Sequence, residues 1–200
     1  PFSKNTFLIL FSMKKINMVD LNGQYRKIRW QVNREIKKVI NTSSFVNGPI
    51  VKEFQNNLQE YLGVKHVIPC ANGTDALQIA LMALDLKRGD EVITTNFSFA
   101  STIEVILLLG LKPVVIDIDP RTFNINPDLI QDKISNKTKA IIPVHLFGQS
   151  SRMEEILEIS NKNNIQVIED NAQALGSKYK FSNSQKQMSG TIGDVATTSF

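Results

Sequence analysis

The chain has 200 residues, of which 42% are hydrophobic and 21% are charged, and its formal net charge is +4. This length allows one sizeable α/β domain, or a large part of one, and the composition is ordinary for a globular protein. Lysines and arginines are scattered, with no run of five or six like charges, which argues against nucleic-acid binding. No apolar stretch reaches the length of about 18 residues that a membrane span needs. The single cysteine, Cys70, excludes a disulfide framework and fits a cytoplasmic protein.

The first 63 residues are expected to precede the main domain. The chain starts at Pro1, whereas Met13 resembles a natural start, so residues 1–12 are expected to be a non-native or disordered leader. Residues 13–63 are expected to form a polar helical arm, because apolar residues recur there on one side of a helix. These residues are Ile28, Val32, Ile36 and Val39.

From residue 64 onward, short apolar runs alternate with amphipathic segments. Strands are predicted over residues 67–70, 89–95, 112–119, 139–148, 165–170 and 194–200. Helices are predicted over residues 76–86, 101–109, 127–134 and 151–161, the second of them capped by Ser101 or Thr102. Residues 177–190 are polar and predict a surface hairpin or loop.

This alternation indicates a mostly parallel sheet that helices cover on both faces. Ligands bind such sheets beyond the carboxyl ends of the strands. The segments predicted to lie at that edge are residues 71–75, 96–99 and 170–173.

The segment Ala71–Asp75, "ANGTD", leads from a predicted strand into a predicted helix. Backbone N–H groups at a helix start, together with the Thr74 hydroxyl, would suit a phosphate group. The alternative is that Asn72-Gly73 is an ordinary turn and that Thr74 only caps the helix.

Asp170 ends the predicted strand "IQVIED", where a buried carboxylate is costly without a cationic partner. One hypothesis is an ion pair with a lysine or arginine that the fold brings close. The other is a cofactor with a protonatable ring nitrogen, which an aspartate keeps protonated in enzymes that use pyridoxal phosphate (PLP). Gln173 could then bond another polar group of the same ring. Phe99 could stack on that ring or could be a core residue.

The remaining reactive residues favour structural interpretations. His145 is expected to be a satisfied structural histidine rather than a catalytic base, and His66 a surface residue. Cys70 has no activating neighbour closer than His66, so it is not expected to be a nucleophile. No residues stand at metal-ligand spacing, and no metal site is predicted.

Six blocks of this sequence, taken together and in order, resemble the DegT/StrS family. They are "NGTDAL" (72–77), "GDEVITTNFSFAST" (89–102), "PVVIDIDPRTFNIN" (113–126), "IIPVHLFGQ" (141–149), "VIEDNAQALGS" (167–177) and "GTIGDVATTSF" (190–200). Members of this family are PLP-dependent nucleotide-sugar aminotransferases. The resemblance implies a three-layer α/β/α large domain of the aspartate-aminotransferase fold (fold type I), of which residues 64–200 would be an incomplete N-terminal part.

The resemblance also implies the roles of individual residues. Asp170 would pair with the ring nitrogen of PLP, Gln173 would bond its phenolic oxygen, and Phe99 would stack on the ring. Three consecutive residues, Gly73, Thr74 and Asp75, would form the phosphate-binding turn. Ser199 would also bind the phosphate.

The implied reaction transfers an amino group, usually from glutamate, to a keto group on a nucleotide-linked sugar, in a homodimer with shared active sites. The Schiff-base lysine would lie beyond Phe200, at position 204, so the chain as given is expected to be an inactive fragment. Two alternatives stay open. The parent could be a sugar dehydratase of the same fold, with histidine at position 204, or a catalytically inactive truncated chain.

Overall fold

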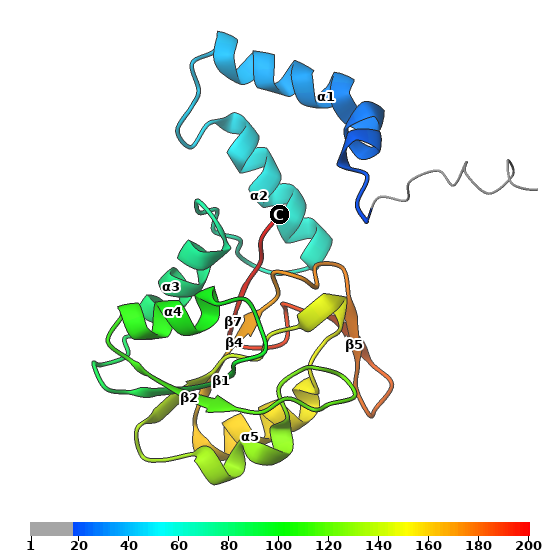
Figure 1. The fold of residues 1–200 in the computed structure, drawn as a ribbon. Coiled ribbons are helices and arrows are strands. Elements are labelled where there is room, and N and C mark those ends of the chain that lie inside the picture. The colour runs from blue at the N-terminus through cyan, green and yellow to red at the C-terminus, as the bar shows by residue number, and fades with distance from the viewer. Residues whose placement is uncertain (1–17) are drawn as a thin grey trace, which may run out of the picture. The chain divides into compact units, whose positions relative to one another are not determined.

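The structure is a computed structural model that describes residues 18–200 (Figure 1). The chain divides into two compact units, Pro1–Phe54 and Gln55–Phe200. The expected leader, residues 1–12, lies outside the described residues. The boundaries of the arm and of the large domain stay predictions.

Two helices lie within the range expected for the arm. Helix α1 is Leu21–Asn41, and it begins after Asp20, whose side chain accepts a hydrogen bond from the N–H of Gly23. Such a cap satisfies a backbone donor that has no partner inside the helix. Helix α2 is Pro49–Leu62 and crosses the division between the units.

The second unit is built on a five-stranded parallel sheet with the order β2-β1-β3-β4-β7. Its strands are β1 (Glu91–Thr95), β2 (Lys112–Ile116), β3 (Thr138–Ile141), β4 (Gln166–Asp170) and β7 (Val195–Thr197). The prediction of a mostly parallel sheet is therefore confirmed.

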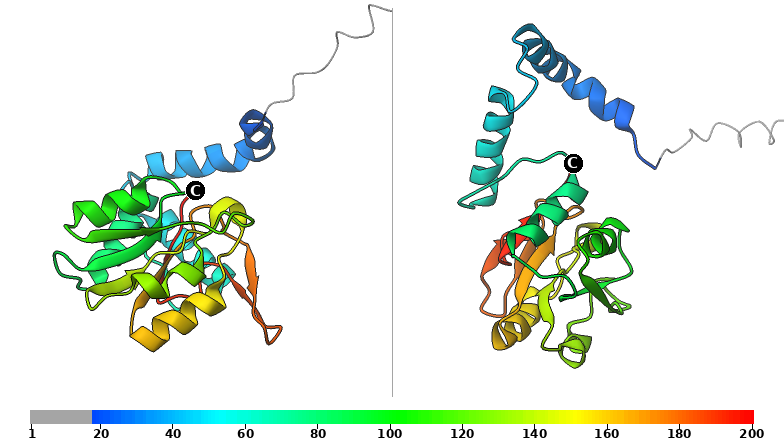
Figure 2. Two further views of the ribbon diagram at one scale, coloured as in Figure 1. Left: turned by 60° about the horizontal axis from the view of Figure 1, so that its bottom comes forward. Right: turned by 90° about the vertical axis from the view of Figure 1, so that its left-hand side faces the viewer.

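Helices cover both faces of this sheet (Figure 2). Helices α3 (Gly73–Ala83) and α4 (Ser101–Leu108) pack on one face, and α5 (Met153–Asn163) packs on the other. Successive strand residues point to opposite faces. Val92 accordingly packs with α3 and α4, and Ile93 packs with α5. The three-layer prediction is confirmed.

Three predicted elements differ most from the structure. Residues 67–70 form no strand: Ile68 is 78% exposed, and no described strand pairs with this segment. The predicted helix 127–134 is instead two 3-10 turns, η1 (Pro127–Leu129) and η2 (Gln131–Lys133). The predicted strand 139–148 ends at Ile141, because Pro143 has no N–H to donate to a neighbouring strand.

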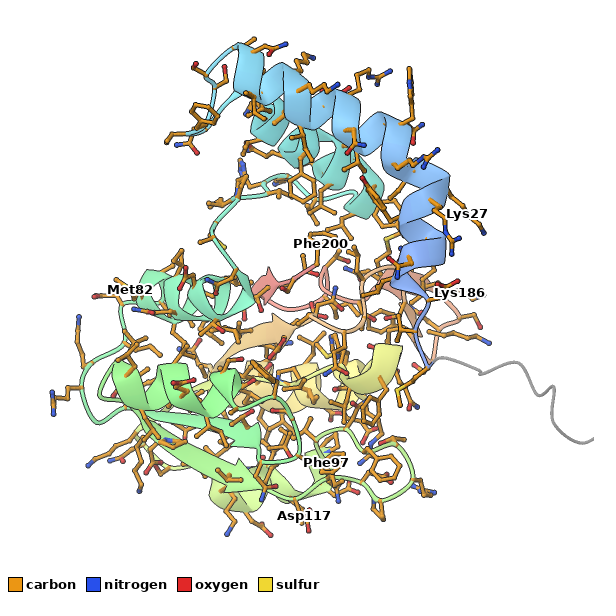
Figure 3. The ribbon with its side chains drawn as sticks, turned by 45° about the horizontal axis from the view of Figure 1, so that its top comes forward. Lys27, Met82, Phe97, Asp117, Lys186 and Phe200 are labelled. Carbon is orange, nitrogen blue, oxygen red and sulfur yellow. The ribbon has the colours of Figure 1, made fainter. Side chains whose placement is uncertain are left out.

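The polar segment after β4 forms the surface hairpin that the sequence predicted. Its strands are β5 (Lys178–Lys180) and β6 (Lys186–Met188), which pair antiparallel. Figure 3 labels Lys186 on this hairpin. Within residues 18–200, no helix combines the length and the apolar character that crossing a bilayer requires.

Candidate functional site

The carboxyl edge of the sheet carries a hollow with a volume of about 310 Å³. Its walls come from the segments that follow β1, β3 and β4 (Figure 3, where Phe97 is labelled). The lining residues are Asn96, Phe97, Ser98, Phe99, Leu146, Phe147 and Gln173. Two residues predicted to contact a ring, Phe99 and Gln173, thus lie in the same hollow.

Phe99 lies just before α4 and is 71% exposed. A core phenylalanine would be buried, so this alternative is wrong. An exposed aromatic ring that lines a hollow offers a flat apolar surface to a planar ligand.

The side chain of Gln173 is oriented by the turn that follows β3. The backbone N–H of Phe147 donates a hydrogen bond of 2.8 Å to Oε1 of Gln173. An N–H group can only donate, so the amide oxygen of Gln173 must face Phe147 and the NH₂ group must face away from it. Gln173 can therefore offer a donor to a ligand. Phe147 itself adopts the left-handed conformation, with φ of 55°, which is uncommon outside glycine.

Asp170 is buried at the end of β4, and its carboxylate accepts hydrogen bonds from two donors among residues 18–200. The Thr102 hydroxyl donates to Oδ2 at 2.8 Å, and the N–H of Ala172 donates to Oδ1 at 3.3 Å. Among the ion pairs of residues 18–200, none includes Asp170. The ion pair with a lysine or arginine that the sequence left open is therefore not found.

Burial raises the pKa of the Asp170 carboxyl, and the hydrogen bonds from Thr102 and Ala172 and the nearby His145 offset this only in part. The ionised form is thus less stable here than in water. A cation placed against this carboxylate would stabilise it.

The neighbouring carboxylate, Glu169, is in the opposite situation. It is fully buried and accepts hydrogen bonds from the N–H groups of Gly190, Ile192 and Gly193 and from Nε2 of His145. Burial alone would raise the pKa of Glu169, but His145 and the backbone donors outweigh it and lower the pKa. Glu169 is thereby satisfied, and it anchors the segment between the hairpin and β7.

His145 is fully buried, and both of its ring nitrogens are used. The N–H of Ser151 donates to Nδ1 at 3.1 Å, so Nδ1 is an acceptor, and Nε2 carries the proton that it donates to Glu169 at 2.7 Å. The prediction of a satisfied structural histidine is confirmed. His66 is exposed, as predicted.

The start of α3 has the features of an anion site. Asn72 caps the helix by accepting from the N–H of Asp75, so the cap is Asn72 and not Thr74. The N–H groups of Gly73 and Thr74 donate to no group among residues 18–200. Two donors at the positive end of the helix dipole are therefore available, whereas the N–H of Asp75 is already used.

Ser199 lies against this helix start. A Cβ atom added at Gly73 would lie 2.9 Å from Cβ and 3.3 Å from Oγ of Ser199. In Figure 3, Phe200, the residue that follows Ser199, lies away from Met82, which is near the C-terminal end of α3. Glycine at position 73 thus allows a close approach that places the Ser199 hydroxyl near the helix N-terminus.

Within the described part of the chain, no group of three or more metal-ligating side chains occurs. Cys70 is exposed, and its Sγ contacts the carbonyl oxygen of Asn72 at 3.4 Å. The site at the sheet edge, as far as residues 18–200 show it, is made of hydrogen-bond donors, one buried carboxylate without a cationic partner, and aromatic rings.

The chain is similar to proteins of one family. Residues 26–200 match the model of the DegT/DnrJ/EryC1/StrS aminotransferase family. The chain is 44% identical over 185 residues to the UDP-2-acetamido-2-deoxy-3-oxo-D-glucuronate aminotransferase of Pseudomonas aeruginosa, and the match covers 92% of this chain and 50% of that protein. The chain spans about half the length of the curated relatives it matches.

Solved structures share the fold. A DegT DnrJ EryC1 StrS aminotransferase from Brucella abortus superimposes with a TM-score of 0.84 at 40% identity, covering 93% of this chain and 50% of that one. NtdA from Bacillus subtilis, solved with bound cofactor PMP, superimposes with a TM-score of 0.76 at 38% identity, covering 82% of this chain and 39% of that one.

Proposed function

Since the chain belongs to the DegT/DnrJ/EryC1/StrS aminotransferase family, we propose that the protein carrying it is a PLP-dependent aminotransferase. It moves an amino group, from glutamate, onto a keto group of a nucleotide-linked sugar. The observation that carries this proposal is Asp170, a buried carboxylate with a raised pKa that forms an ion pair with no cationic side chain among residues 18–200. A protonated pyridine nitrogen is a cation of the required kind. When bound, PLP supplies an electron sink for the bond changes at the substrate carbon.

The start of α3 fits the phosphate end of the cofactor. Gly73 and Thr74 would donate their N–H groups to phosphate oxygens, and Ser199 would donate its hydroxyl. Asp75 would contribute through its place in the turn, because its N–H already donates to Asn72. The close approach of Gly73 and Ser199 is the structural support for this assignment, since a side chain at position 73 would fill the cradle.

The ring end is assigned to Phe99 and Gln173, which line the hollow, and to Asp170, which is buried at the end of β4 and is not among the lining residues. Asp170 would hold the proton on the ring nitrogen, and the oriented NH₂ group of Gln173 would donate to the phenolic oxygen. Phe99, 71% exposed in the lining, would stack on the ring and exclude water from one face of it.

The nucleophile of the reaction is expected from residues outside the chain. The family resemblance places the Schiff-base lysine beyond Phe200, where it would also move the proton to and from the substrate carbon. A polypeptide of residues 1–200 is therefore expected to bind the cofactor weakly and to transfer no amino group.

The remaining partners are proposed from the same family membership. They are a nucleotide-sugar substrate, an amino-acid donor and a second copy of the protein in a cytoplasmic homodimer. Helix α1 supports the homodimer, because it is amphipathic and none of its residues is buried: on its apolar side, Ile28 is 43% exposed and Ile36 is 51% exposed. Apolar surface of this kind often marks an interaction face.

The test is amino transfer by the purified full-length gene product loaded with PLP. It is mixed with glutamate and each of several UDP-, GDP- and dTDP-linked keto-sugars, and the amino-sugar is detected by mass spectrometry. We expect an amino-sugar nucleotide together with 2-oxoglutarate, and none from the Asp170→Asn variant. Loss of water from the sugar without gain of an amino group would identify a dehydratase instead. Absence of PLP binding would refute the proposal.

A further inference from the structure

The shorter hydrogen bond of the Asp170 carboxylate comes from the hydroxyl of Thr102, although Thr102 lies 68 residues away in the sequence. It belongs to the first turn of α4 and is fully buried. At this position the sequence predicts a helix cap, but the cap residue is Ala100, which has no side chain to accept a hydrogen bond. The Thr102 hydroxyl is thus not used by its own helix.

The direction of the hydrogen bond is unambiguous. An ionised carboxylate only accepts, so the Thr102 hydroxyl donates to Oδ2 of Asp170, at 2.8 Å. The second donor, the N–H of Ala172, is more distant at 3.3 Å from Oδ1. Since the terminal torsion of an aspartate is broad, the shorter bond is the main constraint on the plane of the carboxylate.

The segment that follows β1 and the segment at the end of β4 lie close together at two places. Phe99 and Gln173 line one hollow, and Thr102 and Asp170, each three residues from one of them, share a hydrogen bond. The carboxylate is consequently held relative to the surface on which a planar ligand would stack.

We propose that Thr102 is a positioning residue, which holds the Asp170 carboxylate in the orientation and the ionised state that receive the N–H of a protonated ring nitrogen. This inference rests on the proposed function, because it needs a cofactor with such a nitrogen. Thr102 acts only through Asp170. Its effect should therefore appear with ligands that carry the nitrogen and vanish with ligands that lack it.

The experiment measures the binding of two ligands to the full-length protein by titration calorimetry. One is PMP, whose binding needs no Schiff base, and the other is the analogue of PMP in which carbon replaces the ring nitrogen. Wild type is expected to prefer PMP. Thr102→Val, which removes the hydroxyl at nearly constant volume, should weaken PMP binding about tenfold and change binding of the analogue by less than about twofold. Thr102→Ser should restore the preference.

A matched control is available in β1. The hydroxyl of Thr94 is also fully buried and donates at 2.9 Å to a carbonyl, that of Ile142. Thr94→Val removes a buried hydrogen bond of nearly the same length that does not involve Asp170, so it should leave the ratio of the two affinities unchanged.

The outcomes below separate the positioning role from the proposed function. Equal weakening of both ligands by Thr102→Val, or no weakening of PMP, overturns the positioning role. If Thr102→Val does not fold, Thr102→Ala is measured in its place and is judged by the same ratio. If wild type binds neither ligand, the proposed function fails. If wild type prefers PMP over the analogue and Thr102→Val prefers PMP equally strongly, only the positioning role fails.

Discussion

Replacing Gly73 by alanine should separate phosphate binding from folding. The added methyl group would lie 2.9 Å from Cβ of Ser199, whereas carbon atoms in contact are about 3.5–4.0 Å apart. Ser199 or the start of α3 must therefore move by roughly 0.6 Å or more. Alanine is also the better helix former, by up to about 1 kcal/mol in a helix interior. The free energy of unfolding should thus change by less than about 1 kcal/mol.

The effect on phosphate binding should be larger. The displacement acts on the groups proposed to hold the phosphate, the N–H groups of Gly73 and Thr74 and the hydroxyl of Ser199. A hydrogen bond to a charged group contributes about 1.5–3 kcal/mol. Loss of one such bond corresponds to a Kd that rises about 10- to 100-fold.

The assay compares PMP with pyridoxamine, which is the same ring without the phosphate, in the full-length protein. Gly73→Ala should weaken PMP and leave pyridoxamine unchanged. Ser199→Gly removes the opposing Cβ together with one proposed phosphate donor. Gly73→Ala should therefore cost less affinity in the Ser199→Gly background than in wild type, and a double-mutant cycle measures this difference. Unchanged PMP binding by a folded Gly73→Ala protein would show that the phosphate does not bind at the start of α3.

Three further predictions concern the side chains around β4. Asp170→Asn should raise the melting temperature of the ligand-free protein near about pH 8, because it removes an uncompensated buried charge. Because the pKa of Asp170 is raised in the folded protein, wild type becomes less stable as the pH rises through that pKa. The difference in melting temperature between Asp170→Asn and wild type should therefore shrink on acidification, as melting curves over a pH series would show. A difference that grows on acidification would contradict this. Glu169→Gln should destabilise the protein by about 1–3 kcal/mol in urea, since the Gln NH₂ group would face N–H donors. Because the pKa of Glu169 is lowered in the folded protein, wild type loses the stability that ionised Glu169 contributes only as the pH falls through that pKa. The free energies of unfolding of wild type and Glu169→Gln should therefore become equal in acid. Equal stability near neutral pH would contradict the role of Glu169 as an anchor of the segment before β7. Gln173→Glu should weaken PMP about tenfold by placing a carboxylate against the phenolic oxygen, and an unchanged Kd would remove Gln173 from the site.

The layers of the fold could be predicted because they depend on local patterns. Alternating apolar runs and helical periodicity identify the parallel sheet and its helices. The carboxyl-edge rule identifies residues 96–99 and Gln173, which line the hollow, but not Leu146 and Phe147, which line it too. Residues 67–70 show the limit of this reasoning. An apolar run becomes a strand only where another strand pairs with it, and that partner cannot be read from the run itself.

The candidate site was predictable in its residue types and less so in its contacts. The carboxylate of Asp170 at a strand end is visible in the sequence, because burial of a charge requires compensation. The contact with Thr102 is not visible, since it joins residues far apart and the local context favours a helix cap instead. The orientation of Gln173 likewise depends on the left-handed Phe147, for which the sequence carries no distinct signal.

In the proposed function, the Asp170 carboxylate faces a protonated ring nitrogen. The most direct test is the nitrogen-15 chemical shift of ring-labelled PMP bound to the full-length protein, in wild type and in Asp170→Asn. We expect the shift of a protonated pyridinium in wild type and a move toward that of neutral pyridine in the variant. A neutral pyridine shift in wild type would contradict it.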